Sequence, residues 1–121
     1  MIDWTRIKTL REEVGADSFD EVVTLFLEEA ETVINHLASS PDPTTLEEEL
    51  HFLKGSALTL GFHELSDLCQ IGETLAANGQ ADQIRLDPIL AIYQASKIRF
   101  LADLPSRCCH INGAKVAGSL I

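Results

Sequence analysis

The most informative part of this chain is a short run that reads His51-Phe52-Leu53-Lys54-Gly55-Ser56-Ala57-Leu58-Thr59-Leu60-Gly61. Residues three and four apart on a helix are neighbours on one face, so a helix here would place both Lys54 and Gly55 beside His51. Glycine inside a helix costs about 1 kcal/mol relative to alanine. A glycine at this position is therefore expected to serve a purpose other than helix stability. By removing a side chain beside His51, it would let another molecule approach the imidazole.

Apolar residues around this run recur with the alternating spacing of four and three that is typical of a helix packed in a bundle. They are Leu46, Leu50, Leu53, Ala57 and Leu60. His51 is rotated about 100° from Leu50, so it should lie at the edge of this stripe or outside it. A second, outer row contains Glu47, His51, Lys54 and Leu58, and its leucine indicates a partly apolar contact surface. A plainer interpretation is a core histidine with a solvated lysine nearby.

The run resembles the signature of the histidine-containing phosphotransfer (HPt) domain, which reads His-x-apolar-Lys-Gly-Ser-small-x-x-apolar-Gly. The matching positions are His51, Leu53, Lys54, Gly55, Ser56, Ala57, Leu60 and Gly61. The resemblance continues downstream in Leu65, Cys69 and Glu73 and, with the flanking helical patterns, covers most of the chain. It implies a phosphoryl carrier that takes the group from an aspartate on one receiver domain and passes it to another.

The resemblance also implies a role for each residue of the site. His51 would be phosphorylated, at Nε2 as in the family; Lys54 would stabilise charge on the phosphoryl oxygens, and Gly55 would let the partner approach. The expected docking surface adds Glu47, Leu58, Gly61 and His63. Glu47 lies one turn before His51 and is either a partner for the charged imidazole or a solvated carboxylate at the helix start. The Mg²⁺ would belong to the receiver, so neither a metal nor a cofactor of its own is expected here.

Helical periodicity extends over nearly the whole chain, and no segment alternates as a strand would. A short first helix is expected over residues 4–14, with Gly15 as its end. The second is expected to begin with a capping box formed by Ser18 and Glu21. It should end before the segment 39–43, whose two prolines lack the backbone donor that a helix needs.

Three more helices complete the expected order, over residues 44 or 45 to 61, 63 to 78, and 87 to 105. A capping box at Thr44 or Thr45 would open the first of them. An N-cap and a proline at Asp87-Pro88 would open the last, and Pro105 would end it. Long amphipathic helices with short links favour an all-α fold, an antiparallel up-down four-helix bundle with a short additional N-terminal helix. Residues 1–105 would form this HPt-like bundle, and residues 106–121 a C-terminal tail that either packs on it or is mobile.

Composition excludes several other classes of function. The chain has 121 residues, enough for one domain, with a net charge of −10. Such an acidic protein is a poor ligand for nucleic acid or an anionic membrane, and no apolar run approaches the roughly 20 residues of a membrane span. The N-terminus lacks the pattern of a signal peptide, and three cysteines make no disulfide framework. A monomer in the reducing cytoplasm is the simplest expectation.

Cys108, Cys109 and His110 suggest a metal or redox cluster, but they lack both the two-residue spacer of zinc ligand pairs and a second pair. Three functional hypotheses remain. The first is a phosphotransfer protein in a multistep relay, without an ATP site of its own, whose partners are response-regulator receiver domains and a hybrid or sensor histidine kinase. The second is a fragment related to the phosphoacceptor domain of sensor kinases. It is disfavoured because no proline follows His51 before Pro88. The third is a non-catalytic helical adaptor.

Overall fold

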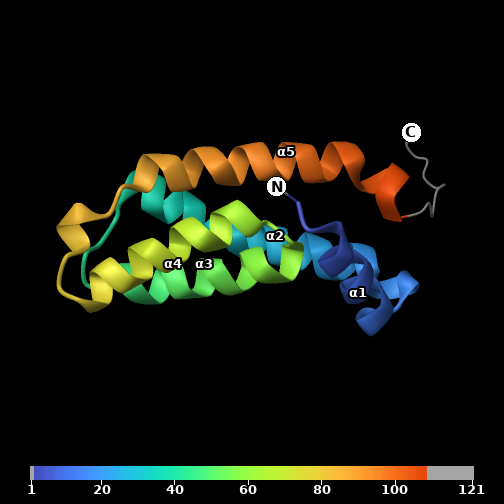
Figure 1. Cartoon of the computed structure of the whole chain (residues 1–121), viewed down its shortest axis with the longest axis horizontal. Helices are drawn as coiled ribbons and strands as arrows, with labels where there is room; N and C mark the ends of the chain where they lie inside the picture. Colours follow the sequence, from blue (N-terminus) through green and yellow to red (C-terminus); the bar gives the residue numbers. More distant parts are fainter. Residues whose placement is uncertain (1, 109–121) are drawn as a thin grey trace.

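The computed structural model describes the backbone of residues 2–108 and the side chains of residues 2–104. In this part of the chain the regular elements are helices, as the sequence predicts (Figure 1). In chain order they are α1 (Trp4–Val14), α2 (Ala16–Ser39), α3 (Leu46–Leu60), α4 (His63–Ala77), the short 3₁₀ helix η1 (Ala81–Gln83) and α5 (Leu86–Cys108). None of the described helices is both long enough and apolar enough to cross a membrane.

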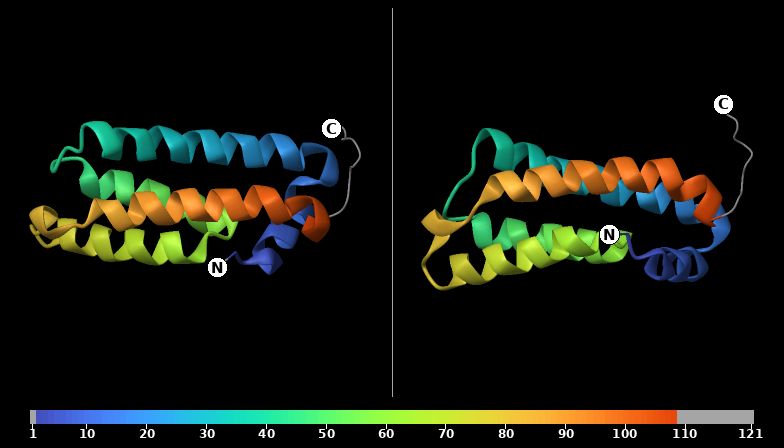
Figure 2. Two further views of the ribbon diagram at one scale, coloured as in Figure 1. Left: turned by 90° about the horizontal axis from the view of Figure 1, so that it is seen from above. Right: turned by 45° about the horizontal axis from the view of Figure 1, so that its top comes forward.

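Four long helices, α2 to α5, form a bundle in which successive helices run in opposite directions (Figures 1 and 2). Helix α3 packs most extensively against α4, while α2 contacts α3, α4 contacts α5, and α5 returns to α2. Helix α1 packs against α2, α3 and α5 at one end of the bundle. The contact between α3 and α4 is therefore the most extensive helix contact among the described residues, and α3 contains the histidine run.

The core is filled by the apolar stripes of all five helices. The stripe of α3 is fully enclosed, from Leu46 through Leu60. Three aromatic rings connect the short helix to the bundle: Trp4 stacks on Phe100 with 5.8 Å between ring centroids, and Phe62 meets Phe100 edge-on at 5.5 Å. Cys69 is buried in the same core, and burial raises the pKa of its thiol to about 12. These contacts agree with a core role for Cys69.

The turn between α3 and α4 depends on Gly61. This residue ends α3 with a left-handed backbone (φ +73°), and the amide of Phe62 donates to the carbonyl of Ala57 at 2.8 Å, which closes the helix end. The amide of Asp3 donates to the Gly61 carbonyl at 2.8 Å, so a Cβ here would lie 2.7 Å from the Asp3 carbonyl oxygen. Gly61 is buried under the N-terminal segment. The structure therefore gives it a turn and packing role and does not support the expectation that it borders the docking surface.

The predicted helix starts are less accurate than the helices themselves. Helix α2 begins at Ala16, directly after Gly15 (φ +89°), so Ser18 lies within the first turn and makes no capping hydrogen bond. Because a single glycine joins α1 to α2, α2 starts directly after Gly15, and Ser18 lies too far into the helix to be its N-cap residue. At α3 the hydroxyl of Thr45 bonds to the carboxylate of Glu49 at 3.1 Å, and no side-chain cap forms.

Helix α5 is longer at both ends than the sequence predicts. It begins at Leu86, which places Asp87 in the first turn. It continues through Pro105 to Cys108, so the prediction that Pro105 ends it is wrong. A proline removes one backbone donor, and so close to the end of a helix the loss of that bond does not force the chain out of helical geometry. Residues 109–121 lie outside the described residues. They include most of the expected tail and Cys109 and His110 of the suggested cluster.

Candidate functional site

The α3–α4 pair places a histidine on the surface and a carboxylate beneath it. His51 projects from the outer face of α3, and 68% of its side chain is exposed. Its Nδ1 lies 2.8 Å from Oε2 of Glu73 on α4. The histidine is therefore an exposed surface residue held from one side, and the interpretation as a core histidine is wrong.

This hydrogen bond determines which ring nitrogen is free. An ionised carboxylate can only accept hydrogen bonds, so the neutral imidazole must carry its proton on Nδ1 to donate to Glu73. The lone pair of Nε2 then faces away from the carboxylate, on a ring that is mostly exposed. The arrangement presents a neutral nitrogen nucleophile to an incoming partner.

Lys54 links the same two helices one turn further along. Its Nζ lies 2.8 Å from Oε1 of Glu73 and donates to Oε1 of Gln70 at 2.9 Å. The Gln70 amide in turn donates to the hydroxyl of Thr74 at 3.0 Å. Only 19% of the Lys54 side chain is exposed. The lysine is thus fixed against α4, and its ammonium has a third donor that neither Glu73 nor Gln70 uses.

Glu73 is held in its ionised form by these neighbours. The hydrogen bond from Lys54 lowers the pKa of the Glu73 carboxyl, and the bond from His51 lowers it further, while partial burial opposes both. The carboxylate therefore stays charged at neutral pH and remains an acceptor for the imidazole.

Gly55 leaves open space beside the histidine. A Cβ at this position would meet nothing within 4 Å, apart from the helix's own backbone, whereas a Cβ at Gly72 on α4 would lie 2.7 Å from a methyl group of Leu50. A Cβ at position 72 would force the Leu50 side chain to shift, whereas one at position 55 would displace nothing. The fold therefore gives no reason for the glycine next to His51.

The surface around His51 is partly apolar. Leu58 and Phe52 on α3 are large hydrophobic side chains that remain exposed. Glu47 is exposed and has no hydrogen-bond or ion-pair partner among the described residues, so it is not the carboxylate that holds His51. His63 is exposed at the start of α4, ten residues from Glu73, or about 15 Å along the helix.

Two residues of the site went unassigned at the sequence level. Glu73 is indicated only by the family resemblance, and no sequence pattern points to Gln70. The resemblance was the only signal for Glu73, because the histidine and this carboxylate are 22 residues apart and meet only through the packing of α3 on α4.

A second histidine also pairs with a carboxylate but lacks the rest of the arrangement. Nδ1 of His36 on α2 contacts Oε2 of Glu49 on α3, and Glu49 also accepts from Thr45. No lysine joins this pair and no glycine lies beside it along α2. Within residues 2–104, no group of three or more histidine, cysteine or acidic side chains is arranged to hold a metal ion.

Comparison with known families agrees with this geometry. A family model described as the Hpt domain matches residues 21–98, more than half of the chain, and the match includes His51, Lys54, Gly55 and Glu73. No curated protein and no solved structure matched the chain.

Proposed function

Because the chain belongs to the Hpt domain family, we propose that it carries a phosphoryl group on His51 between the aspartates of receiver domains in a multistep phosphorelay. The observation that supports this most directly is the hydrogen bond from His51 to Glu73. It leaves Nε2 unprotonated and exposed in a family whose members act in two-component signalling.

The reaction would follow from this geometry. Nε2 of His51 attacks the phosphorus of an aspartyl phosphate on the receiver, an N–P bond forms, and the P–O bond to the aspartate breaks with the electron pair leaving on the carboxylate. The imidazole becomes positively charged as its lone pair is used, and the adjacent Glu73 carboxylate stabilises that charge. The free donor of Lys54 would bind a phosphoryl oxygen. Running the same steps backwards passes the group to a second receiver.

The partner would dock over the outer face of α3 and the adjoining face of α4. Gly55 lets the receiver approach without meeting a side chain, and the exposed Leu58 and Phe52 supply apolar contact. Phosphoryl transfer depends mainly on positioning and charge stabilisation. The receiver would bring the Mg²⁺ and the phosphorylated aspartate, so this protein would act as a cytoplasmic monomer without an ATP site or a metal of its own. A hybrid or sensor histidine kinase would load the relay.

The decisive experiment is transfer from a ³²P-labelled, aspartyl-phosphorylated receiver domain to the wild type and to His51→Gln. We expect acid-labile, base-stable label on the wild type and none on the variant. His36→Gln and His63→Gln are matched controls, because both remove another histidine with exposed surface, and both should keep the label. Label on His51→Gln would move the phosphorylation site elsewhere. No label on a folded wild type from any receiver tested would favour the adaptor.

A further inference from the structure

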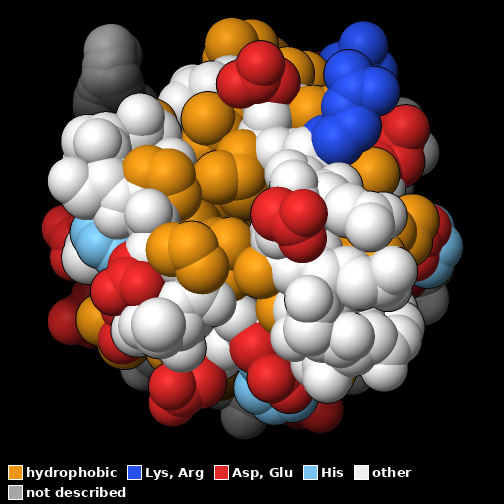
Figure 3. All heavy atoms as spheres, turned by 90° about the vertical axis from the view of Figure 1, so that its left-hand side faces the viewer, with side chains coloured by type: hydrophobic (Ala, Val, Ile, Leu, Met, Phe, Trp, Pro, Cys, Tyr) orange, Lys and Arg blue, Asp and Glu red, His pale blue; other side chains and the backbone are white. Residues whose placement is uncertain are grey.

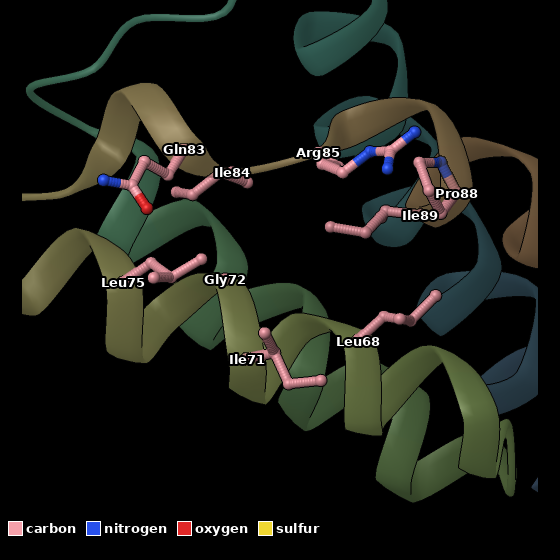
Figure 4. Close-up of a pocket in the computed structure, with 9 residues that line it drawn as sticks. All are labelled: Leu68, Ile71, Gly72, Leu75, Gln83, Ile84, Arg85, Pro88 and Ile89. Atoms are coloured by element: carbon pink, nitrogen blue, oxygen red, sulfur yellow. The ribbon is translucent and has the colours of Figure 1, made fainter.

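A pocket opens on the side of α4 that faces α5, away from His51. It lies between α4, the link that follows η1, and the first turn of α5, and it has a volume of about 240 Å³ (Figure 4). Its walls are almost wholly apolar and are formed by Leu68, Ile71, Leu75, Ile84, Pro88 and Ile89. Gly72 forms part of the wall, and Ile84 packs against it.

The size of the pocket limits what it can hold. Its volume is enough for several groups of the size of a water molecule. Pockets for drug-sized ligands usually span about 300–1,000 Å³, so this one lies below that range and suits a slender ligand better than a nucleotide or a fused ring system. A narrow alkyl chain fits better, because a methylene group is about the size of a water molecule and gains from burial between apolar side chains.

One cation lies at the pocket. Arg85 is exposed, belongs to the lining and makes no hydrogen bond or ion pair with any described residue. In this part of the chain, Arg6, Lys54, Lys97 and Arg99 are each paired with a carboxylate, whereas Lys8 and Arg11 on α1 have no ion pair but do not line the pocket. Figure 3 looks onto this end of the molecule and shows hydrophobic side chains exposed from its centre to its upper edge, with basic side chains at the upper right. In a chain with a net charge of −10, this arginine provides a local positive charge at the edge of an apolar pocket.

We propose that this pocket binds a medium-chain fatty acid, with the alkyl chain between α4 and α5 and the carboxylate on the guanidinium of Arg85. The planar fork of arginine matches a carboxylate with two parallel hydrogen bonds. The net negative charge of the protein would disfavour an anion without a cationic partner. Arg85, the one cation among the pocket-lining residues, would therefore determine where the head group lies. This proposal does not depend on phosphoryl transfer at His51.

The test compares two ligands that differ only in the head group. Octanoate and 1-octanol are titrated below their aggregation limits into ¹⁵N-labelled wild type and Arg85→Gln, and the backbone amides are followed. On the wild type we expect saturable shifts centred on Ile71, Gly72 and Ile84, with octanoate binding about threefold to fivefold more tightly than octanol, the range for a solvent-exposed ion pair. On Arg85→Gln octanoate should bind no more tightly than 1-octanol. Equal affinities on the wild type, or shifts centred elsewhere, would overturn the proposal.

A second pair of variants separates the pocket from general adsorption to apolar surface. Ile71 and Ile98 are 58% and 67% exposed, but only Ile71 lines the pocket. Ile71→Glu should weaken octanoate binding at least tenfold by placing a like charge at the mouth, whereas Ile98→Glu should leave it unchanged. Equal weakening by both would mean adsorption without a site. His51→Gln should bind octanoate like the wild type, so the outcome is independent of the relay.

Discussion

The two oxygens of Glu73 hold two different residues of the same site. Oε2 accepts from the His51 ring, and Oε1 lies against the Lys54 ammonium. One carboxylate therefore fixes the tautomer of the nucleophile and the position of the nearest cation. Because both contacts need an ionised acceptor, the behaviour of Glu73 can be tested without any partner protein.

Replacing Glu73 should change the tautomer of His51. In the wild type at pH 8 we expect the ring to be protonated at Nδ1, because Glu73 accepts there. Glu73→Ala should shift the population toward protonation at Nε2 and slow phosphoryl transfer about tenfold, the value of roughly one hydrogen bond to a charged group. Long-range ¹H–¹⁵N spectra of the imidazole report the tautomer. Glu47→Ala, which removes a carboxylate without a partner, is the control, and an unchanged tautomer in Glu73→Ala would contradict the assignment.

Glu73 should also make stability depend on acid. Its pKa is lowered in the folded protein, mainly by Lys54, from an ordinary value of 4.5. Between the two values the unfolded chain binds more protons at this residue, so the stabilisation is complete above about pH 5.5 and is lost as the pH falls through 4.5 and then through the folded pKa.

Urea titrations of the wild type and Glu73→Gln measure this effect. The free energies of unfolding should differ by about 1–2 kcal/mol at pH 7 and by less than half of that at pH 3. Glu47→Gln should differ little from the wild type at either pH. If the difference in the free energy of unfolding between the wild type and Glu73→Gln stays constant with pH, the charge of the carboxylate contributes nothing to stability.

The residues of the site that could be predicted from the sequence are those that one helix brings together. His51, Lys54 and Gly55 share a face of α3 because of their spacing alone. Glu73 comes from another helix, and no spacing rule connects it to His51. Local spacing leaves Glu47 as either a partner for the imidazole or a solvated carboxylate, and the structure agrees with the second, because Glu47 is exposed and unpaired among the described residues.

At the scale of the helix, α5 carries a polar group that its surroundings do not satisfy. The hydroxyl of Ser96 is fully enclosed and has no hydrogen-bond partner among the described residues. An enclosed hydroxyl without a partner carries its desolvation cost uncompensated. Ser96→Ala should therefore raise the free energy of unfolding, by about 1 kcal/mol.

Ser66 on α4 offers a matched comparison, because it is also buried but donates to the carbonyl of His63 at 2.7 Å. Ser66→Ala should lower the free energy of unfolding by about 1 kcal/mol, since it leaves that carbonyl with one acceptor bond fewer. Chemical unfolding of the two variants gives the comparison. Destabilisation of both proteins by the same amount would indicate that Ser96 has a partner.

Two glycines with left-handed backbone should differ in what they contribute. Gly61 and Gly79 have φ values of +73° and +75°, but a Cβ at Gly61 would lie 2.7 Å from the Asp3 carbonyl oxygen, whereas one at Gly79 would meet nothing within 4 Å. Gly79→Ala should cost about 1 kcal/mol, the backbone term alone. Gly61→Ala should cost at least twice as much, because the N-terminal segment must also move. Equal losses in thermal unfolding would show that the contact with Asp3 contributes nothing.

Helix interiors were easier to predict than helix ends. The period of the apolar residues follows directly from which face is buried, and the apolar stripe of α3 is enclosed as expected. The ends depend on how neighbouring helices meet. The start of α2 at Ala16 results from a junction of one glycine with α1, and the capping residues within α2 carry no information about that junction.

On the scale of the whole molecule, the excess of acidic side chains acts against the compact state. The chain has 19 acidic and 9 basic residues, and four of the described cations are already paired. The remaining carboxylates repel one another over distances comparable with the bundle when the ionic strength is low. Raising the salt from 10 to 100 mM shortens the screening length from about 30 to about 10 Å. Long-range repulsion is therefore screened more than the contacts within ion pairs.

We therefore expect the thermal midpoint to rise by about 2–5 °C between 10 and 100 mM KCl at pH 7. Glu28→Lys tests the cause, because Glu28 is exposed on α2, its side chain makes no described contact, and the change raises the net charge from −10 by two, to −8. This variant should be more stable than the wild type at 10 mM KCl, and its advantage should shrink at 100 mM. A midpoint that falls with salt in both proteins would mean that the ion pairs across α3–α4 and α2–α5 outweigh the repulsion, and Lys54→Met should then reduce the fall.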